Sequence, residues 1–161
     1  MKKLGIIVVL SIFSFSGAMV QLVKVDQEVF GMDCAPCAYG LERGLKKMDG
    51  LQSVKVSLNN GKAYLKLAAD NDLSLQKIQK EVKNNGFSAR SAEVTLNGEL
   101  VNDGNKWSVS VNGETFKVSS DTPDDILTKL KPGKVQLIGR VKDEEDDGLS
   151  NTWNIRITEV L

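Results

Sequence analysis

The chain has 161 residues, which allows one ordinary domain or two small ones. Its 21 basic and 21 acidic residues give a formal net charge of zero, so it lacks the basic excess with which proteins bind nucleic acid. Histidine is absent, which removes the usual general base and the commonest nitrogen ligand for metals. We therefore expect no nucleic-acid partner and no chemistry that depends on imidazole.

The first residues have the pattern of a secretory signal peptide. Lys2 and Lys3 precede an apolar run at residues 4–15, and three small residues follow it. We expect residues 1–18 to be removed and the mature chain to start near Met19, in the periplasm or outside the cell. An uncleaved membrane anchor is the alternative, although the serines in this stretch argue against it.

A half-buried strand is predicted next, because Val23, Val25 and Val29 fall on one face of an alternating run. It leads into Gly31-Met32-Asp33-Cys34-Ala35-Pro36-Cys37, which contains the only two cysteines of the chain. Apolar residues then recur at helical spacing, namely Ala38, Leu41, Leu45 and Met48. We expect Pro36 at the first helical position, since its φ is preset and it lacks an amide proton, with Cys37 in the first turn.

Two thiols at this spacing can hold a soft metal ion or exchange a disulfide. The unpaired N–H groups and the positive dipole at a helix N-terminus favour a thiolate over a thiol. Two thiolates without imidazole suit ions such as Cu(I) or Hg(II), whereas zinc usually takes four ligands. Thiol–disulfide exchange is an alternative, because Cys-Ala-Pro-Cys is close to the Cys-x-Pro-Cys of thioredoxin-like enzymes, and a purely structural disulfide is another.

The pattern as far as residue 92 predicts the order strand, helix, strand, strand, helix, strand. The second and third strands lie at residues 54–58 and 63–67, with turn residues at 59–61 between them. A second amphipathic helix ends at Gly86, and a last strand starts at Phe87. This order predicts a ferredoxin-like α+β fold, with an antiparallel four-stranded sheet and both helices on one face.

The Gly-Met-x-Cys-x-x-Cys sequence, placed between the first strand and first helix of this βαββαβ plan, resembles the heavy-metal-associated (HMA) domain family over residues 22–92. That family includes periplasmic mercury-binding proteins, copper chaperones and the N-terminal domains of metal-pumping ATPases. The resemblance implies that Cys34 and Cys37 bind one soft d¹⁰ ion per chain, Cu(I) or Hg(II). It also implies that Met32 turns inward to support the loop and that Phe87 shields the site.

These features together predict an exported metal carrier and not an enzyme, so no catalytic residue is assigned. A two-coordinate ion stays open to an incoming cysteine, so it can pass to a partner by ligand exchange without release into water. The expected partner is a metal-transporting membrane protein or another bis-cysteine metal protein. No small-molecule substrate for catalysis is expected.

The rest of the chain predicts a small β-rich domain at residues 97–161, after the metal-binding domain at residues 22–96. Its signals are a type I′ turn at Asn112-Gly113, a short helix with Pro123 at its first position, and alternating strands. Five short strands and one helix suggest a small half-open barrel resembling an OB-fold, or a small sandwich. Since no cysteine lies in it, residues 19–96 alone are expected to bind metal as tightly as the mature chain.

Two features of the second half are not assigned as sites. Residues 143–148 resemble a calcium loop, but Glu145 and Asn154 stand where other ligands belong, which favours a solvated acidic hairpin. Trp107 and Trp153 are expected in the core, because tryptophans on alternating strands usually lie there.

Overall fold

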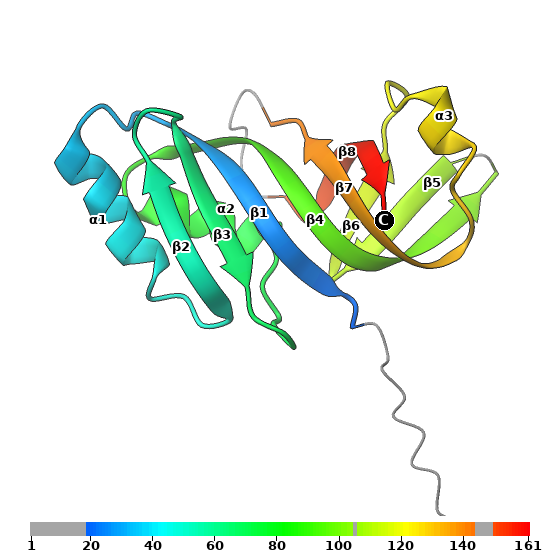
Figure 1. Cartoon of the computed structure of the whole chain (residues 1–161), viewed down its shortest axis with the longest axis horizontal. Coiled ribbons are helices and arrows are strands. Elements are labelled where there is room, and N and C mark those ends of the chain that lie inside the picture. Colours follow the sequence, from blue (N-terminus) through cyan, green and yellow to red (C-terminus); the bar gives the residue numbers. More distant parts are fainter. Residues whose placement is uncertain (1–18, 105, 144–149) are drawn as a thin grey trace, which may run out of the picture.

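The computed structural model describes residues 19–104, 106–143 and 150–161 (Figure 1). The predicted signal peptide and most of the predicted acidic hairpin therefore lie outside the described residues. The first part of the chain forms β1 (Gln21–Phe30), α1 (Ala35–Leu45), β2 (Leu51–Ser57), β3 (Lys62–Leu67), α2 (Leu75–Asn84) and β4 (Ser88–Asp103). The second forms β5 (Lys106–Val111), β6 (Glu114–Val118), α3 (Asp124–Leu127), β7 (Gly133–Val141) and β8 (Thr152–Val160). None of the helices in these ranges is long and apolar enough to cross a membrane.

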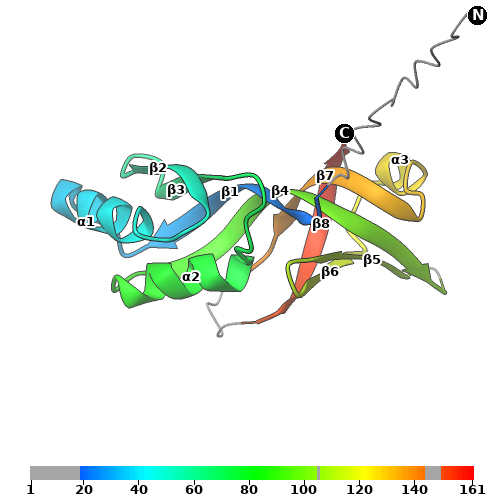
Figure 2. The same ribbon diagram turned by 90° about the horizontal axis from the view of Figure 1, so that it is seen from below.

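Strands β2, β3, β1 and β4 lie side by side in that order, and each neighbouring pair is antiparallel. Helix α1 contacts β2, while α2 contacts α1, β1 and β4. Figure 2 shows the two helices together on one face of this sheet. The element order and the strand order are those of the ferredoxin-like fold, as the sequence predicted.

A β-bulge in β1 changes which residues face the core. The register with β4 slips between Leu22 and Lys24, so that one extra residue of β1 is accommodated there. Leu22 is fully buried as a result, and Val25 and Val29 are buried as predicted. The prediction for Val23 was wrong, because this residue is only partly buried.

Two prolines lie one position away from their predicted places. Helix α1 begins at Ala35 with Cys34 as its N-cap, so Pro36 is the second helical residue. Helix α3 is a single turn that begins at Asp124, and Pro123 is its N-cap residue. Neither shift removes a hydrogen bond, because the first amide protons of a helix have no intrahelical partner.

The second half of the chain closes into a barrel that shares β4 with the first sheet. Strand β4 pairs with β5, β5 with β6, β6 with β8, β8 with β7, and β7 again with β4. The β6–β8 pair is parallel and the others are antiparallel. The β5–β6 turn has positive φ at Asn112 and Gly113, as a type I′ turn requires. A small β-barrel was the predicted architecture for this region.

Strand β4 runs without a break across the predicted domain boundary at residues 96 and 97. It is 16 residues long and pairs with β1 as far as Asn97, while β7 pairs with residues 92–100 on its other edge. The division into two domains therefore stays a prediction, and no linker marks it.

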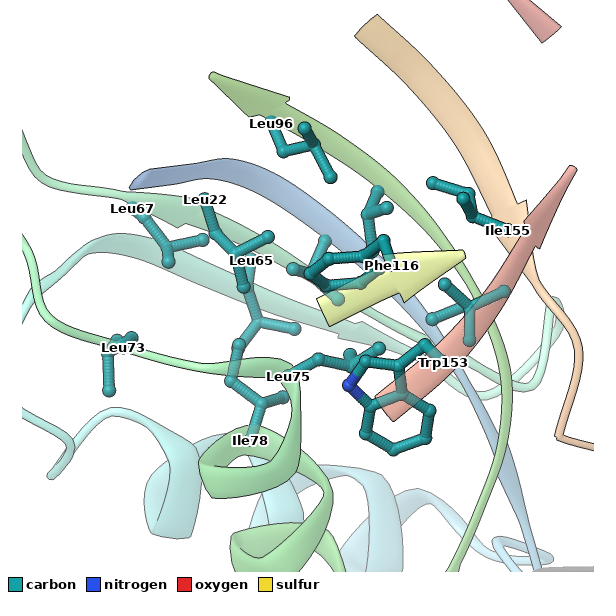
Figure 3. Packing of buried hydrophobic residues seen from close by; sticks show 14 of the residues in the cluster. Leu22, Leu65, Leu67, Leu73, Leu75, Ile78, Leu96, Phe116, Trp153 and Ile155 are labelled. Carbon is teal, nitrogen blue, oxygen red and sulfur yellow. The ribbon is translucent and has the colours of Figure 1, made fainter. Parts of the chain in front are cut away.

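One hydrophobic cluster extends through both halves (Figure 3). Leu65 and Ile78 from the ferredoxin-like half belong to it, as do Phe116 and Ile155 from the barrel. Trp153 is 5% exposed and part of this core, as expected. Trp107 packs against the core but is only partly buried.

A buried carboxylate joins the barrel to α2. Glu114 of β6 is 3% exposed, and its Oε2 accepts a hydrogen bond from the Leu75 amide at 2.7 Å. Its Oε1 accepts from the Gln76 amide at 2.8 Å and from the Trp153 indole at 2.9 Å. These amides belong to the first turn of α2, so a side chain of the barrel caps a helix of the other half. Burial raises the pKa of Glu114.

Further polar contacts cross the junction. Arg140 of β7 donates from both terminal nitrogens to the Glu28 carboxylate of β1, at 3.0 and 3.1 Å. Asn112, in the β5–β6 turn, donates to the Leu73 carbonyl just before α2 at 2.8 Å. None of these groups was predicted from the sequence to join the two halves.

Candidate metal centre

The two cysteines lie where the loop after β1 meets the start of α1, at the end of the molecule far from the barrel (Figure 1). Gly31 has φ +88°, a conformation that glycine adopts without strain, and it turns the chain out of β1. Met32 points into the core and is 7% exposed, whereas Asp33 is exposed. Cys34 and Cys37 are both partly buried, so the loop is anchored by Met32 and presents its sulfur atoms near the surface.

The cysteine side chains lie together at the start of α1. Cys34 has an extended backbone, and its Sγ accepts a hydrogen bond from the Cys37 amide at 3.1 Å. Cys37 lies in the first helical turn, where it was predicted. The two residues are joined by a disulfide, with their Cα atoms 5.0 Å apart. This backbone therefore holds the two sulfur atoms close enough for one small ion to contact both once they are reduced.

The electrostatics at this helix end favour negative sulfur. The first turn of α1 contains no acidic residue that would compete with a thiolate for the helix N–H groups. Across the described residues no cluster of three or more histidine, cysteine, aspartate or glutamate side chains is placed to hold a metal. Two thiolates offer a soft metal ion a site of low coordination number.

Helix α1, which carries Cys37, also contacts β2 and the end of α2. Glu42 accepts a hydrogen bond from the Val56 amide of β2 at 3.0 Å, and a hydrogen bond from Lys46 lowers the pKa of this carboxyl. Gly44 lies so close to the Asn85 side chain that a β-carbon at this position would overlap it. The two helices therefore pack closely against each other at Gly44.

Aromatic residues flank the cysteine loop in the sequence. Phe30, just before it, is 65% exposed, with the Arg90 guanidinium 5.2 Å from its ring centre. Tyr39, just after it, is 64% exposed, with Arg43 at 5.8 Å. Neither ring was predicted from the sequence to have a role at the site. Phe87 is partly buried against the core, and its predicted role in shielding the site stays a prediction.

Part of the chain is similar to known proteins. Residues 28–88 match the heavy-metal-associated domain. The chain is 33% identical over 75 residues to copper-transporting ATPase 2 of Rattus norvegicus, and 32% identical over 76 residues to a copper-transporting ATPase of Helicobacter felis. Each alignment covers 47% of this chain but only 5% and 10% of the respective ATPase.

Solved structures give matches over the same region. A structure described as CopZ metallochaperone aligns with 41% of this chain and 97% of its own, at 23% identity and a TM-score of 0.39. A copper binding domain from a P-type ATPase aligns with 46% of this chain and 92% of its own, at 26% identity and a TM-score of 0.38. The resemblance predicted from the cysteine motif is thus confirmed by the sequence comparisons, since residues 28–88 of this chain match the heavy-metal-associated domain.

Proposed function

We propose that this protein binds one soft metal ion between the thiolates of Cys34 and Cys37 and passes it to a bis-cysteine partner. The observation that carries this proposal is the pair of cysteines held together at the N-terminus of α1, near the surface. The chemistry of the two thiolates suits Cu(I) and Hg(II) alike. The names of the two ATPase relatives favour Cu(I).

Reduction has to precede metal binding. The disulfide occupies both sulfur atoms, and two electrons and two protons convert it to two thiols. Each thiol then loses its proton as it binds the ion, so affinity rises with pH until both are deprotonated. In an oxidising compartment a dithiol reductant or a thiol-disulfide partner supplies these electrons.

Transfer follows from the low coordination number. A thiolate of the partner bonds to the ion while both Cys34 and Cys37 are still attached, and the bond to one of these cysteines then breaks. The second partner thiolate displaces the other cysteine in the same way. The ion is never free in water, so transfer is faster than dissociation from a tight thiolate site.

We place this activity in the periplasm or outside the cell, on the basis of the signal-like pattern of residues 1–18. A metal-transporting membrane protein or another bis-cysteine metal protein is the partner we propose. The role is that of a carrier and not of an enzyme.

Thiol–disulfide exchange is the second candidate, and the disulfide at a helix N-terminus favours it. In that case the thiolate of Cys34 attacks a substrate disulfide to form a mixed disulfide, which Cys37 then resolves. The substrate is reduced to two thiols, and the Cys34–Cys37 disulfide forms again.

One preparation tests both candidates. The reduced protein is titrated with Cu(I) against a competing chelator under anaerobic conditions, and the expected result is one ion per chain. Cys34→Ser and Cys37→Ser should each weaken binding by on the order of a hundredfold or more, because one thiolate cannot complete a two-coordinate site. Asp33→Asn, in the same exposed loop, is the matched control and should bind normally.

The same protein is then assayed for metal transfer to a bis-cysteine acceptor and for reduction of insulin disulfides. A carrier transfers metal faster than it releases the ion to chelator alone. Catalytic disulfide turnover, with metal transfer no faster than spontaneous release, would establish the second candidate instead.

A further inference from the structure

The barrel has a hollow on its outer side, at the opposite end of the molecule from the cysteines. Its volume is about 890 Å³, within the range of small-ligand sites. The lining residues come from β5, β6 and β8, from the ends of β4 and β7, and from the segment that follows β6. Another pocket, beside Met19 and Lys134, is about 260 Å³.

The register of the strands explains the polar character of this hollow. Ser108 of β5 pairs with Lys117 of β6, which in turn pairs with Asn154 of β8, so these three form a row across the barrel. Val109 and Phe116, which alternate with residues of this row, are fully buried. The row therefore faces outward, and it offers a hydroxyl, an ammonium and an amide side by side.

Trp107 lies on the other face of β5 from Ser108, because the two residues alternate along the strand. Its side chain packs partly against the core, and it also lines the hollow. An indole ring can cover the apolar face of a ring-shaped ligand while neighbouring polar groups bind the ligand's edge.

The charges in the hollow favour an anion. Among the described residues Lys106 and Lys117 have no carboxylate partner, whereas Lys142 donates to Asp121 at 2.7 Å. Hydrogen bonds from Lys142 and Ser119 lower the pKa of Asp121 to about 2, so this pair stays ionised and satisfied. Asp103 is the other carboxylate in the lining, which leaves a surplus of positive charge.

We infer that this hollow binds an acidic oligosaccharide, with a sugar ring against Trp107, hydroxyls on the polar row and the acidic group near Lys106 and Lys117. The second and third strands of the barrel, counted from β4, are β5 and β6, and this face of OB-like barrels binds oligosaccharides or oligonucleotides. A nucleic-acid strand would need a longer basic groove and several stacking rings, which a neutral chain with one tryptophan here does not offer. The inference is independent of metal binding.

Fluorescence tests this inference, because the chain has two tryptophans and Trp153 is buried. The full mature chain is titrated with trigalacturonic acid and with a sulfated chondroitin tetrasaccharide, alongside neutral maltotriose and pentathymidylate. We expect saturable binding of at least one acidic saccharide in the millimolar range or tighter, and at least tenfold weaker binding of maltotriose.

Lys117→Gln should weaken that binding about tenfold, since a hydrogen bond to a charged group is lost. This residue is exposed, so the variant should fold, and Lys131→Gln is the matched control on the same half of the chain. Trp107→Phe should remove most of the fluorescence response while leaving calorimetric binding measurable. Failure of both acidic saccharides to bind, equal binding of maltotriose, tighter binding of pentathymidylate or an unaffected Lys117→Gln variant would each overturn the inference.

Discussion

The ferredoxin-like half and the barrel use their polar residues in opposite ways. In the first half the distinctive side chains, Cys34 and Cys37, lie near the surface at the start of α1. In the barrel the distinctive side chain is Glu114, which is buried and bonded to three donors, two of them in the other half. Under the proposed function, metal binding belongs to the first half and the buried contacts of Glu114 stabilise the fold, so substitutions should separate metal affinity from folding stability.

The largest expected effect comes from ending the chain after residue 96. The cut falls inside β4, removes the β7 strand that pairs with residues 92–100, and takes Glu114 from the start of α2. We now expect a fragment of residues 19–96 to lose on the order of 4 kcal/mol or more of unfolding free energy relative to the mature chain. Tight metal binding by this fragment, which the sequence alone suggested, then requires that metal induces its folding.

Thermal unfolding of the fragment and of the mature chain, each without metal, measures this difference. A fragment that unfolds cooperatively within a few degrees of the mature chain would show that the barrel does not support the metal-binding half.

Glu114→Ala should have the next largest effect. It leaves the Leu75 and Gln76 amides and the Trp153 indole without their acceptor in a buried place, which should cost about 3 kcal/mol. Urea denaturation measures the loss, and Glu99→Ala, at an exposed position of β4, should stay within about 0.5 kcal/mol of wild type. The Cu(I) affinity of folded Glu114→Ala should change less than about threefold. A large loss of affinity in the folded variant would contradict the separation of roles.

The Arg140–Glu28 pair should contribute less. Both side chains are partly exposed, at 41% and 30%, so solvent screens their attraction. A double-mutant cycle with Arg140→Gln and Glu28→Gln should give a coupling free energy of about 0.5 to 1 kcal/mol. A coupling near zero would mean that this pair does not help to join the halves.

The smallest effect concerns pH. Burial raises the pKa of Glu114 above its ordinary value of 4.5, so the folded protein keeps this proton to a higher pH than the unfolded chain does. The stabilisation that results is fully present below pH 4.5 and is lost as the pH rises through the folded-state value. The advantage of wild type over Glu114→Gln in unfolding free energy should therefore be greater near pH 4 than at pH 7. An advantage of wild type over Glu114→Gln that grows towards pH 7 would contradict a raised pKa for Glu114.

Much of the fold could be predicted from the sequence, because local patterns determine it. The turns at Gly61, Gly86 and Gly113 have positive φ in the structure, at places where the sequence offers Asn-Gly pairs. The cysteine pair at the start of α1 was predictable from Pro36 and the apolar spacing that follows. The bulge that leaves Val23 only partly buried could not be predicted, since it depends on the register with β4 and not on the composition of β1.

The junction could not be predicted, because it arises from contacts between residues far apart in the chain. Leu75 and Glu114 are separated by 39 positions, and no local pattern links them. One signal was present: Glu114 alternates with Phe116 and Val118, so it stands at an inward position of a strand. A charged residue at such a position indicates a buried partner. The sharing of β4 by sheet and barrel likewise left no linker for the sequence to show.

X-ray absorption at the copper edge of the reduced, Cu(I)-loaded protein tests the central claim most directly. The account predicts one copper per chain with two sulfur neighbours and no nitrogen neighbour, because Cys34 and Cys37 are the only cysteines and histidine is absent. The signal should disappear from the double serine variant after gel filtration, while Asp33→Asn retains it. Copper bound mainly by oxygen or nitrogen, or retained tightly without either cysteine, would contradict it.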